Sequence, residues 1–358
     1  MGDEPSAAPT WPSPTEDEIA EAVEATWGGA EPVEIVWRSA RPLSSTVGVR
    51  SGDGAMVVVK RLPLHLRDLA ALAEEHRFMA HLRAGGIPVP EVRATRGARP
   101  VGGAPGFVYE VQRAGVGEDR YRADFSWTPY RDAADAAAAG AMTARMHLAA
   151  AGFDAPARPA RPLVASLHGD DVARAFEWHI ARRPAVARFL ADRDWRAEIP
   201  DLRIDLTGVA PLWTHGDWHA TNLLWTGTEV TSVFDFGLAD RTTAVFDLAT
   251  AIERAAVDWV SLRDGGPAHV RAEQVRALLE GYRAVRPLAA AEQALLADLL
   301  PVVHLGYELS EIDYFLSVAD EPRSAEIAYQ DWLLGHLSWF RTPAGGDLLA
   351  LVRDLAAE

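Results

Sequence analysis

The sequence contains a single lysine and a single asparagine, and each lies in a segment suited to phosphate chemistry. Lys60 ends the apolar segment 56–59, and Asn222 follows Asp217 by five positions. Lysine offers a compact point charge, whereas arginine, which supplies the other basic side chains apart from histidine, offers a planar fork. We therefore expect a chemical role for Lys60, with a coding bias toward arginine as the alternative explanation.

Three residues with hard oxygen donors, Asp217, Asn222 and Asp235, are expected to meet at one end of a predicted β-hairpin. Asp217 and Asn222 lie before the hairpin and Asp235 follows it, so antiparallel pairing returns all three to the same end. Phosphoryl transfer needs a group for the acceptor's proton, oxygen ligands for Mg²⁺ and a cation on the phosphates. We assign Asp217 to the acceptor hydroxyl, and Asn222 and Asp235 to the metal. Lys60 would bind the α- and β-phosphates.

An acidic residue on the helix predicted at about 67–84 should hold Lys60 in place through an ion pair. Glu75 is the preferred partner, because the apolar residues Met79 and Leu82 follow it at helical spacing. Glu74 is the alternative, since adjacent acids on a helix are also typical of a solvated face.

These segments resemble the motifs of the aminoglycoside phosphotransferase and choline kinase superfamily, whose fold is that of the protein kinases. The resemblance covers about residues 30 to 340, and its motifs at 215–222, 235–237 and 247–249 occur in the expected order. It implies ATP, with GTP not excluded, and Mg²⁺ as cofactors. Residues 282–288 look most like the homoserine kinase type II branch.

The same resemblance implies supporting roles for three further residues. His215 and His219 would support the catalytic loop, and Asp247 would anchor it by buried hydrogen bonds. A zinc site formed by the two histidines and Asp217 is a less favoured alternative, because the chain lacks a matching His helix or open-site pattern.

The nucleotide is expected to meet two strand segments of the first lobe. Where protein kinases have a glycine-rich loop, this chain has Ser44, Ser45 and Thr46, whose hydroxyl and backbone N–H groups could cradle phosphates. The adenine should lie against the strand that contains Glu110 and Val111, bound mainly by backbone groups.

An acidic group on the helix predicted at about 290–315 is the candidate acceptor site. Tyr307, Glu308 and Glu311 share one face of that helix, and Asp313 is close in sequence. In the superfamily that the motifs resemble, the helical lobe supplies the acceptor pocket, so these acids could hold a cationic amino group. A solvated acidic face is the alternative, since the chain carries a formal net charge of -16.

Hydrophobic periodicity predicts an α+β chain with two lobes. The resemblance implies that these lobes form a bilobal, protein-kinase-like fold. We expect a disordered tail at 1–14, and a nucleotide-binding lobe at 15–112 with an antiparallel β-sheet and one key helix. The remainder, 113–358, would form a mostly helical lobe for catalysis and acceptor binding. Thr15 and Glu18 form a capping-box pattern for a first helix. In the second lobe, helices are predicted near 172–191, 247–260, 272–285, 290–315 and 325–340.

Composition restricts the possible partners. The net charge argues against a general nucleic-acid binder, whose affinity for phosphates comes from clustered basic residues. No apolar run approaches the roughly 20 residues of a membrane span, and the chain has no cysteine, so we expect a cytoplasmic protein. The oligomeric state is left open by these features.

The sequence therefore favours an ATP- and Mg²⁺-dependent transfer of phosphate to a hydroxyl of a small, amine-bearing molecule. Candidates are an antibiotic such as an aminoglycoside, an amino alcohol, a homoserine-like metabolite or a sugar. A protein Ser/Thr kinase is one alternative, although Leu248 follows Gly237 by only 11 positions, which is short for an activation segment. A nucleotide-binding pseudokinase is the other.

Overall fold

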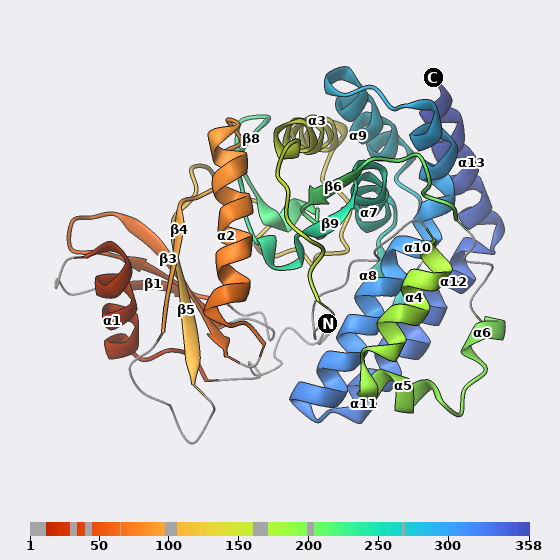
Figure 1. Cartoon of the computed structure of the whole chain (residues 1–358). Helices are drawn as coiled ribbons and strands as arrows, with labels where there is room; N and C mark the ends of the chain where they lie inside the picture. The colour runs from red at the N-terminus through yellow and green to blue at the C-terminus, as the bar shows by residue number, and fades with distance from the viewer. Residues whose placement is uncertain are drawn as a thin grey trace. The chain divides into compact units, whose positions relative to one another are not determined.

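The computed structural model describes residues 12–28, 34–39, 45–64, 66–96, 106–159, 171–198, 204–266 and 269–358. The chain divides into two compact units (Figure 1). The first comprises Met1–Ala84 and Pro88–Val116, and the second comprises Gly85–Ile87 and Gly117–Glu358. The first unit thus extends a few residues beyond the boundary expected at 112.

A five-stranded antiparallel sheet forms the centre of the first unit, in the order β1-β2-β3-β5-β4. Side chains along β3 alternate between buried and partly buried positions, as the two-residue period of a strand requires. The predicted antiparallel sheet is confirmed. Its strands are β1 (Glu34–Arg38), β2 (Ser45–Arg50), β3 (Met56–Pro63), β4 (Val92–Arg96) and β5 (Phe107–Arg113).

Two helices, α1 (Glu16–Trp27) and α2 (Leu69–Ala84), cover opposite faces of this sheet (Figure 1). The predicted capping box starts α1: the Glu18 amide donates to the Thr15 hydroxyl, and the Thr15 amide donates to the Glu18 carboxylate. Arg61 of β3 lies on the α1 face, 3.5 Å from Glu18. Glu110 of β5 lies on the α2 face, in contact with His76.

The second unit is mostly helical and carries two small antiparallel sheets. Pairing of β6 (Pro211–Thr214) with β9 (Asp240–Thr243) brackets the hairpin of β7 (Leu223–Thr226) and β8 (Glu229–Val233). The helices are α3 (Ala133–Ala150), α4 (Val172–Ala181), α5 (Pro184–Leu190), α6 (Trp195–Glu198), α7 (Ala244–Ala256), α8 (Trp259–Arg263), α9 (Ala272–Val285), α10 (Ala290–Tyr314), α11 (Pro322–Ile327), α12 (Gly335–Phe340) and α13 (Pro343–Ala357).

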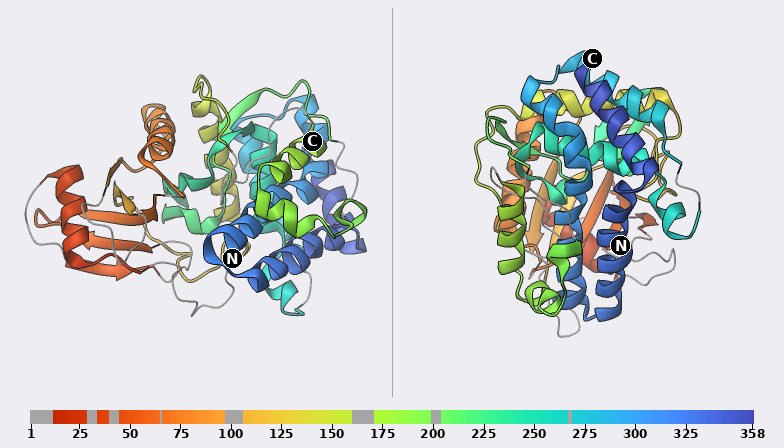
Figure 2. Two further views of the ribbon diagram at one scale, coloured as in Figure 1. Left: turned by 60° about the horizontal axis from the view of Figure 1, so that its bottom comes forward. Right: turned by 90° about the vertical axis from the view of Figure 1, so that its right-hand side faces the viewer.

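Long helices build the core of this unit. α10 lies against α7 and α13, and Figure 2 shows the helices of this unit from two further directions. α3 packs closely on α9, because Gly140 and Gly281 leave room for backbone contact: a Cβ on either glycine would overlap a carbonyl oxygen of the other helix. α7 lies between these helices and the β6–β9 sheet, in contact with α9, β6 and β9.

Several elements differ from their predictions. The helix expected at 172–191 is broken into α4 and α5, because Pro184 cannot continue a helix from α4 and instead starts α5. The helix expected at 325–340 includes a π-helical segment, Ala328–Leu334. The β6–β9 pair and α13 were not predicted. Among the helices of the described residues, none is both long and apolar enough to cross a membrane.

Candidate active site

The loop between β6 and β7 gathers the residues with hard oxygen donors. It ends in a 3-10 turn, Ala220–Asn222, which leads directly into the β7–β8 hairpin. Asn222 Nδ2 donates to the carbonyl oxygen of Asp217 at 3.0 Å and lies 3.4 Å from its Oδ2. Across the hairpin, the Phe234 amide donates to the Asn222 carbonyl, and Asp235 is the next residue, so it lies close to Asn222. The structure therefore brings Asp217, Asn222 and Asp235 to one end of the hairpin.

Asn222 and Asp235 carry the kinds of oxygen donor that bind a hard cation. In the described part of the chain, the side-chain contacts of Asn222 all use its nitrogen, so its amide oxygen is turned away from the loop. Asp235 is exposed and adopts a left-handed backbone, with φ 62° and ψ 65°. This conformation is strained for most residues, though tolerated by Asp, and such strain is concentrated at functional sites. One carboxylate and one amide oxygen fit Mg²⁺, which prefers oxygen ligands.

Two histidines support the loop from within. His215 Nε2 donates to the Phe234 carbonyl at 3.0 Å, and its Nδ1 accepts from the Asp217 amide at 3.2 Å, an assignment that follows from the partners. His219 contacts the Thr221 hydroxyl with Nδ1 and the Asn222 amide with Nε2. His215 has no ring nitrogen left for a metal, so the structure does not support the zinc alternative.

Asp247, near the start of α7, anchors the loop backbone. Its Oδ1 accepts from the Gly216 amide at 2.8 Å, and its Oδ2 accepts from the His215 amide at 3.3 Å. His147 of α3 contacts the same Oδ2 at 3.0 Å and reaches the Tyr282 hydroxyl of α9 with its other nitrogen. Burial raises the pKa of Asp247, but the hydrogen bond and charge of His147 outweigh it and lower the pKa overall.

Asp217 forms an ion pair that the sequence analysis did not anticipate. Its Oδ1 lies 3.0 Å from Nη2 of Arg254, on α7. The guanidinium carbon of Arg254 stands 3.9 Å from the centre of the Trp127 ring and 4.8 Å from that of Tyr307. Burial raises the pKa of Asp217, yet Arg254, followed by His219, holds it well below its ordinary value. Arg254 is two helical turns after Asp247 on a mostly apolar helix, and this spacing was the available signal.

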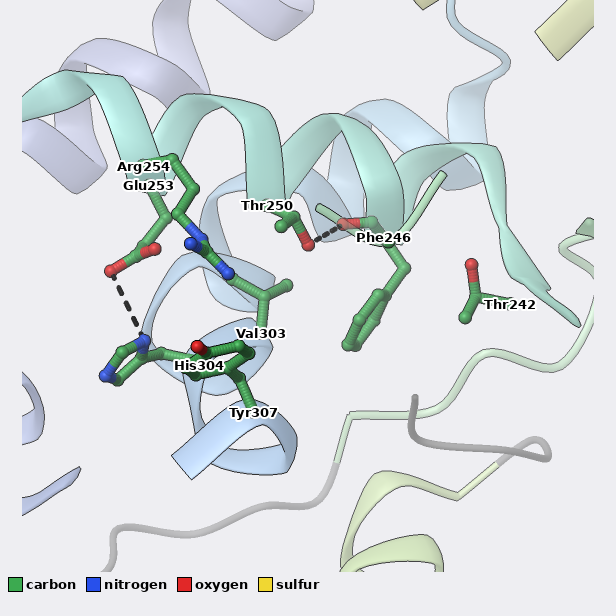
Figure 3. Close-up of a pocket in the computed structure, with 9 residues that line it drawn as sticks. Thr242, Phe246, Thr250, Glu253, Arg254, Val303, His304 and Tyr307 are labelled. Carbon is green, nitrogen blue, oxygen red and sulfur yellow. Dashed lines mark hydrogen bonds and ion pairs between the residues drawn. The ribbon is translucent and has the colours of Figure 1, made fainter. Parts of the chain in front are cut away.

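A pocket lies next to this pair, between α7 and α10 and beside the loop that joins β6 to β7 (Figure 3). Figure 3 shows Glu253 and Arg254 of α7 facing His304 and Tyr307 of α10. The pocket therefore combines apolar walls with charged groups adjacent to Asp217. Its lining residues are Gly216, Thr242, Phe246, Thr250, Glu253, Arg254, Val303, His304 and Tyr307.

Two acids of the predicted acceptor site are buried behind this pocket. Glu308 and Glu311 are each 1% exposed, which excludes the solvated acidic face considered above. Tyr307, which lines the pocket, lies with its hydroxyl 3.5 Å from Glu311. Burial is the main reason that the pKa of each glutamate is raised to about 7. A bound cation would favour the ionised form of both.

Asp313 does not belong with these acids. Its carboxylate lies 3.6 Å from Arg183 and accepts a hydrogen bond from Ser317. Two residues beyond Glu311, it is turned by about 200° around the helix, so its side chain leaves the face that carries Tyr307. The structure thus separates this predicted acceptor residue from the other three.

A buried histidine cluster adjoins the pocket. Glu253, His304 and His336 place one possible metal-binding atom each within 4.8 Å of one another. However, the His304 and His336 rings are stacked, with centroids 4.0 Å apart and planes 25° apart, so their in-plane lone pairs do not converge on one point. Glu253 instead accepts a hydrogen bond from His336 at 3.1 Å. We assign the cluster to hydrogen bonding and packing.

In the first unit, Lys60 lies in a row of side chains across three strands. It is directly opposite Thr46 on β2 and Glu110 on β5, and side chains of directly paired residues share a face. Ser45 pairs with Arg61 and therefore belongs to the other face, where its hydroxyl donates to the Pro12 carbonyl at 3.4 Å. Of the three residues predicted to cradle the phosphates, Thr46 shares the face of Lys60 and Ser45 does not. Ser44 lies outside the described residues.

The two candidate partners of Lys60 on α2 differ in burial. Glu75 is buried and lies 3.2 Å from Arg67. Glu74 lies toward Arg77, at 3.7 Å, on the more exposed side of the helix. Glu75 therefore lies on the buried side of α2, as the spacing of Met79 and Leu82 had indicated.

Glu110 and Val111 lie in the interior of β5, between β3 and β4. Both residues have ladder partners on each side, so their backbone groups are taken up by the sheet. The expected contact of adenine with these backbone groups is therefore corrected: such contacts would have to come from beyond Arg113, where β5 ends.

Comparison with known proteins places these features in a family. The model of a family described as the phosphotransferase enzyme family matches residues 10–288. A homoserine kinase from Methylobacillus flagellatus is 28% identical over 292 residues, which are 75% of this chain and 81% of that protein.

Two solved structures share the fold. An amicoumacin kinase, solved with AMP-PNP and Ca²⁺, has a TM-score of 0.54 at 17% identity and covers 84% of this chain and 89% of its own. A microcompartment-associated aminopropanol kinase has a TM-score of 0.53 at 17% identity. That match covers 90% of this chain and 94% of the kinase. The predicted α+β, protein-kinase-like fold is confirmed.

Proposed function

The chain belongs to the phosphotransferase enzyme family, and we propose that it transfers the γ-phosphate of ATP to a hydroxyl group of a small, amine-bearing molecule. The observation that carries the proposal is the loop in which Asn222 is hydrogen-bonded to Asp217. Asp247 anchors the backbone of this loop. Asp217 would receive the acceptor proton, and Asn222 and Asp235 would hold Mg²⁺. Bound there, Mg²⁺ would neutralise charge on the phosphates.

The first unit would supply the remaining nucleotide contacts. Lys60 offers a point charge for the α- and β-phosphates, and Thr46 offers a hydroxyl on the same face of the sheet. Glu75 would orient Lys60 from the buried side of α2. GTP meets the same contacts as ATP at the phosphates, so base preference is not part of this proposal.

The reaction needs no covalent bond to the protein. The acceptor oxygen forms a bond to the γ-phosphorus while the bond from that phosphorus to the bridging oxygen breaks. The acceptor proton passes to the carboxylate of Asp217, and ADP leaves. Loss of such general base help typically costs about 10² to 10⁴ in rate.

The buried acids support an amine on the acceptor. Glu308 and Glu311 lie behind the pocket beside Asp217, and an ammonium group would supply the positive charge that favours their ionised form. Relatives named for homoserine and aminopropanol act on compounds that combine an amine with a hydroxyl, which agrees with this proposal. The short interval between Gly237 and Leu248, filled by β9 and the start of α7, favours a small acceptor over a protein.

The test is Mg²⁺-dependent ADP release from the purified protein across a panel of acceptors. The panel contains homoserine, amino alcohols, choline, aminoglycosides, other antibiotics, amino sugars and neutral sugars, with Asp217→Asn as the control. We expect turnover with one amine-bearing class, reduced at least about 10²-fold in the variant. Nucleotide binding without turnover on any acceptor would instead indicate a pseudokinase, and turnover unaffected by the substitution would remove Asp217 from the chemistry.

A further inference from the structure

Arg254 is a buried charge that none of the roles above explains. It is 3% exposed and lies on α7, all of whose 13 residues are buried. Burying a guanidinium costs free energy unless an opposite charge compensates for it. Its partner is Asp217, so the fold keeps a buried cation directly beside the proposed base.

Two aromatic rings fix the position of this cation. Trp127 and Tyr307 both lie within cation–π distance of the guanidinium, and their ring centroids are 5.2 Å apart. Trp127 precedes α3 and Tyr307 lies on α10, so these two residues and Asp217 hold Arg254 in place from three separate segments. A side chain clamped in this way can impose an orientation on its partner.

The two oxygens of Asp217 have different surroundings. Oδ1 is buried and faces Arg254, whereas the side chain as a whole remains 17% exposed. Oδ2 lies 3.4 Å from Asn222 Nδ2 and 3.4 Å from His219 Nε2. The oxygen on the side of the proposed metal ligand is therefore Oδ2.

We propose that Arg254 is the positioning residue of the base: it holds Oδ1 of Asp217 so that Oδ2 receives the acceptor proton. The inference rests on the proposed function. In the reaction, the acceptor O–H bond breaks and its proton moves to Oδ2, while the electrons of that bond form the new bond to phosphorus. Arg254 touches neither the acceptor nor the phosphate, and acts through Asp217 alone.

The test compares Arg254→Met and Arg254→Lys with the wild type. For Arg254→Met we expect kcat to fall by about 10²-fold, the typical effect of a misplaced catalytic group, with the KM for ATP unchanged. Arg254→Lys keeps the charge, but its kcat should recover only in part, because an ammonium cannot reproduce the planar fork between the rings.

Arg193→Met is the matched control. The Arg193 guanidinium lies 4.1 Å from the ring centre of Phe189 and 4.8 Å from that of Tyr329, and it pairs with Glu326 at 2.6 Å. Arg193→Met therefore removes the same kinds of contact as Arg254→Met, but at a site away from the loop that carries Asp217. We expect its kcat to match the wild type. An Arg254→Met enzyme with the same kcat as this control would overturn the proposal.

A second measurement separates failure of this inference from failure of the proposed function. Urea unfolding of Arg254→Met, Asp217→Asn and the double variant measures the coupling of the pair without any acceptor. Additive shifts of the unfolding midpoint would overturn the coupling and with it the inference. Non-additive shifts in a protein that shows no turnover dependent on Asp217 would keep the pair but reject the proposed reaction.

Discussion

At the scale of single residues, Lys60 is confined by its neighbours on the sheet. Thr46 and Glu110 lie directly opposite it on the two adjacent strands, so a longer planar head group has little freedom to reach the same point. We expect Lys60→Arg to lower kcat/KM for ATP by about 10-fold or more while leaving the acceptor KM unchanged. Initial rates at varied ATP test this, with the exposed Arg77→Lys on α2 as the control. Wild-type kinetics for Lys60→Arg would make the single lysine a coincidence of composition.

Which site residues meet could be predicted only where the connection is local in sequence. Asp217, Asn222 and Asp235 are joined by one loop and one hairpin, so strand pairing alone brings them together. Arg254 could not be predicted in the same way, because its contact with Asp217 depends on how α7 packs against the loop. The sequence showed that Arg254 lies on a mostly apolar helix, but not which residue its charge faces.

A similar distinction explains the residues whose placement differs. Ser45 was grouped with Thr46 by chemistry, yet successive residues of a strand point to opposite faces. Asp313 was grouped with Glu311 by nearness in sequence, yet a helix turns about 100° per residue. In both cases the strand or helix was predicted correctly. The face on which the side chain lies depends on the register of the strand pairing or on the rotation of the helix against its neighbours.

At the scale of elements, the catalytic loop depends on a close approach to the segment that follows the hairpin. Gly216 has φ +75°, and a Cβ at this position would overlap the carbonyl oxygen of Leu238. We expect Gly216→Ala to displace the loop, lowering kcat by about 10²-fold and stability by about 2 kcal/mol or more. Activity assays and urea unfolding of the same preparation measure both effects.

Gly265→Ala is the control for that substitution. Gly265 also has a positive φ, +83°, but open space surrounds the position of its Cβ. This variant should carry only the backbone strain, about 1 kcal/mol, and keep the wild-type kcat. If the two variants lost equal stability and neither lost activity, the contact with Leu238 would have no part in forming the site.

Elements with strong local signals were predicted best. The capping box of α1 and the full span of α9 agree with the structure. The β6–β9 pair escaped prediction because each strand has only four residues and its partner is distant in the chain, so alternation has no room to show. Long-range pairing, rather than propensity, makes these segments strands, and they position both ends of the site.

At the scale of the whole molecule, the second unit concentrates buried carboxylates in a chain that is already strongly acidic. Burial raises the pKa of Glu253, Glu308 and Glu311, but the outcome depends on the partner of each. The pKa of Glu253 is lowered overall, chiefly by its hydrogen bond from His336. For Glu308 and Glu311, burial prevails. The same unit therefore contains acids that stabilise it at neutral pH and acids that destabilise it.

The pH dependence of stability should distinguish these two kinds of acid. A carboxyl whose pKa is raised on folding, from 4.5 to about 7 for Glu308, imposes no penalty below its unfolded pKa and a full penalty above its folded pKa. We therefore expect Glu308→Gln to stabilise the protein relative to wild type at about pH 8, by up to roughly 3 kcal/mol, and much less at about pH 4. Urea unfolding at both pH values measures the difference.

Glu253→Gln is the control. Glu253 is as buried as Glu308, but its pKa is lowered, so this substitution should instead destabilise the protein at about pH 8. If Glu308→Gln had the same effect at both pH values, Glu308 would not titrate in this window, and the positive charge that we expect from an amine-bearing acceptor would already be supplied by the protein.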